Sequence, residues 1–481
     1  MEDFYFSTSD PTERKRRRKL INEGKLRKIA TRLYTSIMDD DELLKAIKSG
    51  WPQIVRGLYP NAIISHRTAF DYKPSPQGCV YITHSTSKII EIGSLKIVLI
   101  RGPNLHKDDN RFLGTHCSSR PRAYLEMFSA SKRGTNDDRF YSQEEIENKL
   151  ETIISYEGEE ALNAFRDQAR DISKDLALEK NFENLDSVIG ALMGTRKAKL
   201  KSKSAISRSE GLAYDRDRVL LFSELSSYLK GQPLFNLKDP LISNIDHFNN
   251  KAFFESYFSN YIEGTKFLIE EAERIIFEKE IITNRTGDSH DVGGTYDIAS
   301  NQNFMTKRPS SFDEFISDLK YIHINIMKSR EDKRPGEFKQ NGNMAGATYF
   351  VRPDKVLGTL NKGYDYYQDL SHPFARAIFA SFLISEVHPF DDGNGRTCRI
   401  VLNRELLNSG MPSIIIPTVF REDYLGGLKS LTKRGIPGAL VRMFTRAIKF
   451  SHLEFTSYQK IKKEISTRNW FLESNEAKII E

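Results

Sequence analysis

The stretch HPFDDGNGRTCR, residues 388–399, holds the side chains of this sequence that are best placed to do chemistry together. It brings an imidazole (His388), a carboxylate (Asp392) and two guanidinium groups (Arg396 and Arg399) into one short segment. Histidine has an ordinary pKa near ~6.5, so it can serve as a neutral base at neutral pH. Arginine side chains bind phosphate groups through paired hydrogen bonds. The stretch therefore predicts a base beside an anion-binding site.

Gly393, Asn394 and Gly395 lie between this carboxylate and the two arginines. These residue types accept backbone conformations with positive φ, in which consecutive N–H groups converge on an anion. The residues that follow, RTCRIVLNRELLNSG, have the spacing of a helix, and a helix N-terminus binds phosphate. Two arginines three positions apart share one face of that helix, which favours a polyphosphate. Asp392 is the carboxylate placed to hold Mg²⁺ against such phosphates.

A buried helix is predicted to lead into this stretch, because HPFARAIFASFLISEV is largely apolar. The residues expected on its core face are Phe374, Ala377, Ile378 and Phe382. A residue that precedes proline avoids the α-helical conformation, so the helix should end at His388. The imidazole then lies at the mouth of a loop, and Phe390 is expected to anchor that loop in the core.

At every constrained position the stretch resembles the motif of the Fic family, HPFx(D/E)GNGRxxR. The matching residues are His388, Pro389, Phe390, Asp392, Gly393, Asn394, Gly395, Arg396 and Arg399. The resemblance implies a mostly α-helical enzyme that moves AMP from ATP onto a hydroxyl group of a target protein and releases pyrophosphate. It also implies that His388 is the base for a Ser, Thr or Tyr hydroxyl and that Asp392 binds Mg²⁺. The residues that it implies for nucleotide binding are Gly393, Asn394, Gly395, Arg396 and Arg399.

Two further segments fit this resemblance. Fic enzymes clamp the target with a β-hairpin flap, and FKQNGNMAGATYFVRP, residues 338–353, has turn residues followed by a short strand. The residues assigned to the flap are Met344, Ala345, Gly346, Ala347, Thr348 and Tyr349. Upstream, SNYIEG matches the inhibitory pattern (S/T)xxxE(G/N), with Ser259 and Glu263 on one helix face. The resemblance implies that Glu263 pairs with Arg399, where the γ-phosphate side of the nucleotide would lie.

The N-terminal half has a different pattern. Strand-like segments run to about residue 132, with Gly93-Ser94 as a predicted hairpin turn, and helical spacing begins at Ser142. A basic helix with RKRRRK at positions 14–19 is expected to stop at Gly24, before a short strand pair. This half resembles AbiEi-like antitoxins and regulators, which usually begin with a winged helix-turn-helix. The basic helix is a candidate for contact with DNA phosphates, and a solvated face or a regulatory role stays open.

The predicted fold class is α+β with several domains: an N-terminal α/β winged-helix-like or antitoxin-like domain, and a mostly helical Fic fold with its hairpin flap. The basic, serine-rich stretch 187–211 is interpreted as a linker or boundary. The expected divisions are an N-terminal α+β domain (1–135), a helical antitoxin-like region (136–205), a helical linker (206–250), the Fic domain with its inhibitory helix (251–455) and a polar C-terminal tail (456–481).

The 481 residues are 39% hydrophobic and carry a net charge of +7, which is ordinary for a multidomain globular protein. Three cysteines, none in a CxxC pair, argue against a disulfide framework or a zinc site and favour a reducing cytoplasm. No signal-peptide pattern stands at the N-terminus, and the longest apolar run is too short to span a bilayer. We therefore expect a cytoplasmic protein without a membrane partner.

These patterns predict an autoinhibited protein adenylyltransferase that uses ATP and Mg²⁺ and acts on a target protein with a surface hydroxyl residue. Removal of AMP, transfer of another nucleotide, and a DNA-binding antitoxin-like regulator stay open as alternatives. The sequence also leaves open the target, the base preference and whether the chain forms a homo-oligomer.

Overall fold

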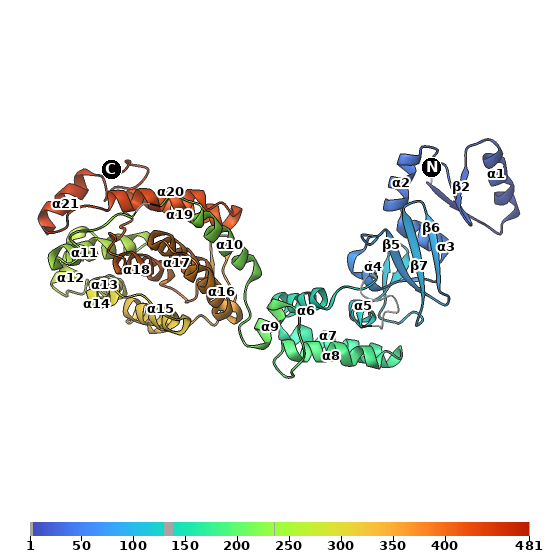
Figure 1. The fold of residues 1–481 in the computed structure, drawn as a ribbon, viewed down its shortest axis with the longest axis horizontal. Coiled ribbons are helices and arrows are strands. Elements are labelled where there is room, and N and C mark those ends of the chain that lie inside the picture. Colours follow the sequence, from blue (N-terminus) through green and yellow to red (C-terminus); the bar gives the residue numbers. More distant parts are fainter. Residues whose placement is uncertain (1–2, 129–137, 235, 481) are drawn as a thin grey trace. The chain divides into compact units, whose positions relative to one another are not determined.

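The computed structural model describes residues 3–128, 138–234 and 236–480, and the chain divides into two compact units, Met1–Glu210 and Gly211–Glu481 (Figure 1). The first unit contains two β-sheets and several helices, whereas the second is almost entirely helical. The predicted fold class, α+β with a mostly helical C-terminal half, is thus confirmed. No helix within the described ranges is both long and apolar enough to cross a membrane.

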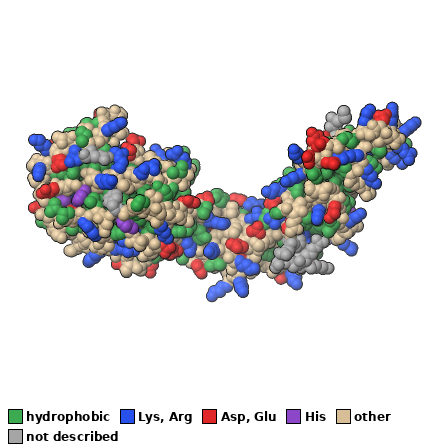
Figure 2. All heavy atoms as spheres, turned by 45° about the horizontal axis from the view of Figure 1, so that its top comes forward, with side chains coloured by type: hydrophobic (Ala, Val, Ile, Leu, Met, Phe, Trp, Pro, Cys, Tyr) green, Lys and Arg blue, Asp and Glu red, His purple; other side chains and the backbone are tan. Residues whose placement is uncertain are grey.

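The first unit begins with a small β-sheet and a basic helix. Strand β1 (Phe4–Phe6), helix α1 (Pro11–Asn22), strand β2 (Arg27–Ala30) and strand β3 (Leu33–Thr35) follow one another, and the strands pair in the order β1-β3-β2. The prediction of a basic helix that stops at Gly24 before a strand pair is therefore confirmed, and Gly24 has a φ of 70°. Figure 2 shows Lys and Arg side chains gathered over this part of the unit, at the right of the view.

A six-stranded mixed sheet forms the centre of the first unit, with strand order β6-β7-β5-β4-β9-β8. Its strands are β4 (Ile63–Ile64), β5 (Cys79–His84), β6 (Lys88–Ile92), β7 (Leu95–Arg101), β8 (Asn110–Phe112) and β9 (Thr115–Cys117). Strands β6 and β7 form an antiparallel hairpin with Gly93 at φ 56°, which confirms the predicted turn. The helices of this part are α2 (Asp40–Ser49), α3 (Trp51–Leu58), α4 (His66–Asp71) and α5 (Arg120–Met127).

Four more helices complete the first unit: α6 (Gln143–Glu157), α7 (Glu159–Asp175), α8 (Glu179–Leu192) and α9 (Lys203–Ser209). The stretch 187–211 was expected to be a linker or boundary, and the structure gives it more order than a linker has. Helix α8 extends into it, and the backbone N–H of Ser202 donates to the Glu147 carboxylate at 2.6 Å. Ala205 is fully buried. Val188, Ile189 and Leu192 at the end of α8 are buried with Ala205 in one hydrophobic cluster, and this packing was not indicated by the loss of apolar spacing.

The second unit is built from twelve α-helices among its described residues. They are α10 (Arg216–Lys230), α11 (Ile245–Ile262), α12 (Ile269–Phe277), α13 (Thr286–Ala299), α14 (Gln302–Met305), α15 (Phe312–Met327), α16 (Val356–Gln368), α17 (Pro373–Val387), α18 (Asn394–Asn408), α19 (Arg421–Arg434), α20 (Gly438–Phe450) and α21 (Tyr458–Thr467). Single 3₁₀ turns lie at Glu331–Lys333, Pro353–Lys355 and Thr418–Phe420. Helices α17 and α18 lie near the middle of this unit in Figure 1, and they pack against each other.

Helix α17 is the predicted core helix, and nearly all of its residues are buried. The four apolar residues expected on its core face are at most 1% exposed, and the opposite face is also covered. A helix that is apolar all round is buried all round. Helix α16 covers it on one side, and α10 packs there as well.

The segments before and after the central helices both contribute to this core. In α10 the side chains of Phe222, Leu225 and Leu229 are buried in the main hydrophobic cluster. In the C-terminal segment Ile461 and Trp470 are fully buried in the same cluster. Few apolar side chains are needed to hold such a helix, so a mostly polar composition concealed the packing of 206–250 and 456–481.

Candidate active site

The loop between α17 and α18 presents His388 in a conformation that is unusual for a residue with a side chain. Helix α17 ends at Val387, as the following proline predicts, and His388 has φ 53° and ψ 60°. Its backbone N–H still bonds to the Ile384 carbonyl oxygen, which closes the helix. The left-handed backbone turns the chain sharply away from the helix axis. The imidazole therefore projects from the helix end and stays outside the packed interior of the helix.

Two hydrogen bonds between Asn394 and the backbone of Phe390 stabilise the rest of the loop. The Asn394 side chain accepts a hydrogen bond from the Phe390 N–H and donates one to the Phe390 carbonyl oxygen, both at 2.9 Å. The Phe390 ring is fully buried and stacks on the His323 ring of α15 at 3.8 Å, which confirms its predicted anchoring role. The Asn394 side chain is thus used mainly inside the loop, and its backbone N–H lies at the start of α18.

His323 supports the loop from below and was not singled out in the sequence. Its Nδ1 accepts from the Gly336 N–H at 2.9 Å, so its Nε2–H donates to the Asp392 carbonyl oxygen at 3.0 Å. Burial lowers the pKa of His323 to about 4, which keeps the ring neutral in this role. A single histidine among the apolar residues of a predicted helix is a weak signal, because buried histidines of this kind are common.

The surroundings of His388 keep its imidazole neutral and oriented. The ring stacks on Phe350 with centroids 3.8 Å apart, and its Nδ1 lies 3.3 Å from the Ser385 carbonyl oxygen. Burial lowers the pKa of His388 to about 4, and the neighbouring Lys339 ammonium lowers it further, against the raising effect of the Ser385 contact. A tautomer with its proton on Nδ1 leaves the Nε2 lone pair available as a base.

Helix α18 begins where the glycine-rich segment was predicted to form an anion site. Gly393 has φ 73°, a left-handed conformation, and it immediately precedes the first helical residue. A Cβ atom added at Gly395 would lie only 2.0 Å from the Oε1 atom of Glu263. The Glu263 carboxylate therefore rests against the first turn of α18, at the positive end of the helix dipole.

Glu263 reaches this position from the end of α11, together with Ser259. The Arg399 guanidinium donates to Glu263 Oε1 at 2.6 Å and to the hydroxyl and carbonyl oxygens of Ser259 at 2.9 Å each. The Arg399 side chain is buried, whereas that of Glu263 is 36% exposed. Burial alone would lower the pKa of Arg399, but the Glu263 carboxylate raises it, so this guanidinium stays charged.

Arg396 is occupied by internal partners. Its Nη1 lies 2.9 Å from the Asp291 carboxylate of α13 and 3.3 Å from Asn260 Oδ1 of α11. Its Nε atom is buried and has no hydrogen-bond partner among the described residues. The two arginines thus both face α11, one through Asn260 and the other through Ser259. Asp291 has no motif around it in the sequence, and only the three-dimensional fold brings it to Arg396.

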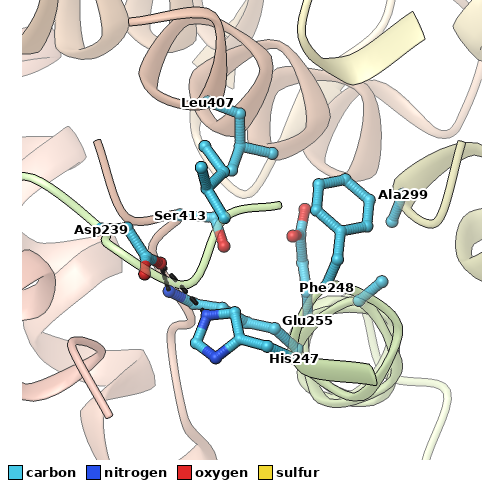
Figure 3. A pocket seen from close by; sticks show the side chains of 10 residues that line it. Asp239, His247, Phe248, Glu255, Ala299, Leu407 and Ser413 are labelled. Atoms are coloured by element: carbon cyan, nitrogen blue, oxygen red, sulfur yellow. Dashed lines mark hydrogen bonds and ion pairs between the residues drawn. The ribbon is translucent and has the colours of Figure 1, made fainter. Parts of the chain in front are cut away.

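A cluster of buried charges holds the N-terminal half of α11, about two turns before Ser259. His247 and Lys251 lie 3.1 and 3.6 Å from the Asp239 carboxylate, around a small cavity of about 10 Å³ (Figure 3). Figure 3 shows Glu255 projecting from the same helix toward this cavity. Burial raises the pKa of Glu255 to about 7 and lowers that of Lys251 to about 8. The cluster fixes the helix that carries the predicted inhibitory residues.

Asp392, the predicted Mg²⁺ ligand, points partly into solvent. Its side chain is 54% exposed, and Oδ1 accepts a hydrogen bond from the Gly393 N–H at 2.6 Å. The other carboxylate oxygen, Oδ2, has no hydrogen bond or ion pair with any residue that the structure describes. No group of three or more His, Cys, Asp or Glu residues within the described ranges is arranged to hold a metal. One half-exposed carboxylate fits Mg²⁺ only when phosphates and water supply the other ligands.

The predicted flap is a short β-hairpin of strands β10 (Met344–Ala345) and β11 (Thr348–Tyr349). Gly346 has φ 57°, as the first turn residue of a tight hairpin requires. The Phe350 N–H bonds to the Asn343 carbonyl oxygen, so the next pair, Met344 and Tyr349, has its N–H and C=O groups pointing outward. On the β11 edge, the Tyr349 carbonyl oxygen accepts from Arg218 of α10 at 2.6 Å. The β10 edge is the open one.

Lys339 joins the base of this hairpin to the loop between α17 and α18 and was also missed in the sequence. Its backbone N–H donates to the Pro389 carbonyl oxygen at 2.9 Å, and its ammonium donates to Asn343 at 2.6 Å. Burial lowers the pKa of Lys339 to about 7. The Asn343 amide in turn donates to the Phe390 carbonyl oxygen at 3.0 Å. The hairpin and the loop are therefore fastened as one assembly.

Comparison with known proteins gives the same segment a family. The sequence pattern of the Fic/DOC family matches residues 312–406. The protein adenylyltransferase Fic of Drosophila willistoni is 27% identical over 187 residues, which cover 37% of each chain. The protein adenylyltransferase fic-1 of Caenorhabditis briggsae is 32% identical over 117 residues, 24% of this chain and 23% of that protein. The chain thus spans well under half of the relatives that it matches.

A solved structure of Fic-1 from Caenorhabditis elegans, residues 134–508, is also similar. It aligns with 66% of this chain and 88% of its own, at 19% identity and a TM-score of 0.38. The family match includes α15, α17 and most of α18, and it contains the whole loop described above. Residues 312–406 of this chain are thus the part that matches the Fic/DOC family.

Proposed function

We propose that this protein is an autoinhibited protein adenylyltransferase, which transfers AMP from ATP to a Ser, Thr or Tyr hydroxyl of a target protein. The observation that carries the proposal is the placement of a neutral imidazole, His388, at the mouth of the loop that opens α18. A base and a phosphate-binding helix start within one short loop are the two parts that such a transfer needs.

In the proposed reaction, Nε2 of His388 takes the proton of the target hydroxyl while the hydroxyl oxygen attacks the α-phosphorus of ATP. The new bond joins this oxygen to phosphorus, the bond to the β-phosphate breaks, and pyrophosphate leaves. The Ser385 carbonyl oxygen supports this role, because it favours the tautomer with the proton on Nδ1. A pKa near 4 keeps the base unprotonated at neutral pH and makes its conjugate acid a ready proton donor.

The first turn of α18 is the proposed binding site of the terminal phosphates of ATP. Gly395 lacks a side chain there, and Arg399 lies on the same side of the helix with a guanidinium suited to phosphate. Asp392, with a half-exposed carboxylate at the loop, would hold Mg²⁺. A bound Mg²⁺ would neutralise charge on the phosphates.

Glu263 is proposed to inhibit the enzyme because its carboxylate occupies the phosphate-binding site at the first turn of α18. Its carboxylate already occupies the space above Gly395 and pairs with Arg399. An exposed ion pair contributes only ~0–1 kcal/mol, whereas a nearly complete shift between two states needs about 5.5 kcal/mol. The buried guanidinium, the Ser259 contacts and the physical obstruction together support stronger inhibition than the pair alone.

The open edge of β10 is proposed to bind an extended segment of the target by adding a strand. Outward-pointing main-chain groups of Met344 are available for this pairing, and Arg218 closes the opposite edge. The Met344 and Tyr349 side chains are 52% and 72% exposed, which suits contact with another chain. The fastening of the hairpin by Lys339 supports a fixed distance between the bound segment and His388.

Removal of AMP from a modified protein is a second candidate reaction at the same site. The observation that favours it is a carboxylate, Glu263, whose charge acts on the His388 ring. A carboxylate in that position can orient a water molecule as the attacking group. The two reactions differ in their requirement for ATP.

The decisive experiment incubates the full chain with ATP labelled on the α-phosphate and follows label in protein. Glu263→Gly should raise self-modification at least tenfold over the unchanged protein, because the phosphate-binding site is cleared. Adding His388→Ala to Glu263→Gly should remove the label, and general-base loss typically costs about 10²- to 10⁴-fold. Glu278→Gly, which removes an exposed acid after α12, is the matched control. Label that persists in the folded double variant, or no gain in Glu263→Gly, would overturn the respective assignments.

A further inference from the structure

Helix α1 of the first unit presents an unusual concentration of positive charge. Six basic residues follow one another over Arg14–Lys19, and the helix contains a single acid, Glu13. None of its residues is buried. Its first turn is capped locally, because the Asp10 carboxylate accepts from the Thr12 N–H at 3.0 Å. The helix therefore keeps its shape while nearly all of its surface faces outward.

The charges of α1 are only partly balanced within the protein. Glu13 lies 3.3 Å from Arg17 and 3.8 Å from Arg16. Lys15 and Arg18 have no ion pair among the residues that the structure describes. Like charges spaced along one helix repel each other and destabilise it slightly. A polyanion laid along the helix would remove this repulsion.

An open groove of about 570 Å³ lies beside the helix. Side chains that line it and can donate hydrogen bonds are Ser7, Thr8, Arg14, Lys15, Arg17, Arg18 and Tyr34. Arg14, Lys15 and Arg18 of this lining are exposed, so their charged groups are available to a phosphate. The groove thus combines the donors that phosphodiester groups require.

The hairpin that follows α1 adds two more exposed cations. Lys28 lies on β2, and Arg32 lies in the turn before β3 with φ 68°. The strand order β1-β3-β2 places this hairpin in the sheet that α1 accompanies. Positive charge therefore extends from the helix to the adjacent turn (Figure 2).

We propose that α1 and the β2–β3 hairpin form a binding surface for duplex DNA, with α1 in the major groove. The major groove of B-form DNA is about 12 Å wide and admits an α-helix, whereas that of A-form RNA is too narrow for side chains to enter. The face of α1 that carries Arg14, Lys15, Arg18 and Lys19 is exposed and would enter the groove, where these cations would contact phosphates. Arg17 lies on the other face and is only 17% exposed. This function belongs to the first unit and does not depend on the Fic reaction.

The test is fluorescence anisotropy of the full chain with a labelled mixed-sequence duplex of ~20 bp, about two helical turns, at salt concentrations from ~50 to ~200 mM. Lys15→Gln combined with Arg18→Gln removes two unpaired cations. Affinity at ~100 mM salt should fall at least tenfold, and the salt slope should become shallower by about 1.8, since each lost phosphate contact contributes about 0.9. The matched control, Lys197→Gln with Lys199→Gln, removes two exposed charges from the other basic cluster and should bind as the unchanged protein does.

Competition distinguishes DNA from other polyanions. An unlabelled DNA duplex should displace the probe at lower concentration than an RNA duplex of the same sequence or phosphatidylserine vesicles of equal charge. Preloading the duplex with the major-groove ligand methyl green should weaken binding, whereas the minor-groove ligand netropsin should not. Equal competition by RNA or vesicles, equal loss in the control variant, or no loss in Lys15→Gln with Arg18→Gln would overturn the proposal.

Discussion

Helices α1 and α18 are both rich in arginine, but the arginine side chains of α18 are buried whereas most of those of α1 are exposed. In α18 the side chains of Arg396, Arg399 and Arg404 are at most 8% exposed, and each pairs with an acid from elsewhere in the unit. In α1 the basic side chains are largely exposed and share few acids. A buried cation is committed to its internal partner, because leaving it unpaired costs several kcal/mol. Exposed cations exchange water and salt for a phosphate at little cost.

The difference explains why the two helices suit different tasks. Under the proposed function, a phosphate at α18 would compete with Glu263 for Arg399, so its binding would be conditional. At α1 nothing inside the protein has to be displaced before an anion can bind. Conditional binding suits regulated catalysis, and unconditional binding suits attachment to a polymer. Three measurements test this contrast, in order of decreasing effect.

The largest effect is expected from Asp291→Asn, which leaves Arg396 of α18 without its buried acid. Breaking a buried ion pair from one side typically costs about 3 kcal/mol or more. Urea unfolding in a Trp51→Phe background measures this, because Trp470 is then the remaining tryptophan and lies in the core of the second unit. Lys15→Gln with Arg18→Gln on α1, followed through Trp51 of the first unit in a Trp470→Phe background, should change the free energy of unfolding by less than about 0.5 kcal/mol. Equal decreases in the free energy of unfolding would contradict the difference proposed between the buried arginines of α18 and the exposed cations of α1.

An intermediate effect is expected from Met344→Pro in the Glu263→Gly background. Proline removes an N–H that points outward from β10 and leaves the hairpin's own hydrogen bonds in place. Modification of a protein target should fall about tenfold, as expected for a lost strand-pairing bond of ~1.4 kcal/mol, while nucleotide binding is kept. Met344→Ala keeps the N–H and should keep the rate.

The dependence of target modification on salt concentration gives a second test with the same two variants. Strand pairing uses neutral main-chain groups, so the rate should depend weakly on ionic strength, unlike binding to α1. A steep salt dependence of target modification would show that charge, and not the β10 edge, selects the target. An unchanged rate in Met344→Pro would remove the edge from the proposal.

The smallest effect is expected in the pH profile of self-modification by Glu263→Gly. Burial lowers the pKa of His388 to about 4, so the base form persists as the pH falls from 7 to 5 and is lost only near pH 4. The rate should therefore change less than about twofold over that interval. An imidazole with a pKa of ~6.5 would lose about thirtyfold in its base form at pH 5. A decline centred near pH 6.5 would contradict the burial of the ring.

The sequence predicted the loop well because its determinants are local. Proline after His388 ends a helix, glycine at 393 permits a left-handed turn, and Phe390 anchors a loop that has no other apolar residue. The partners of the loop were not predictable in the same way. Asp291, His323 and Lys339 lie between 50 and 105 positions away from the residues of 388–399 that they contact, and none has a motif.

In the N-terminal unit, too, local features were predictable from the sequence and long-range contacts were not. Strand alternation and the Gly93 turn indicated its hairpin, whereas the order of the six strands depends on contacts between distant segments. The mostly polar segments at 206–250 and 456–481 concealed their packing, because three or four buried side chains are enough to fix a helix. Composition averaged over a segment does not detect so few residues.

The missing Cβ of Gly395 has a consequence for how this protein would respond to different nucleotides. The small space above it is filled by the Glu263 carboxylate and cannot hold two anions at once. In the proposed reaction, a nucleotide too short to reach that space would gain nothing by displacing the carboxylate, whereas a full triphosphate would have to displace it. The fraction of protein with bound nucleotide and the rate of the reaction would then vary independently. A measured dissociation constant would report the first and say little about the second.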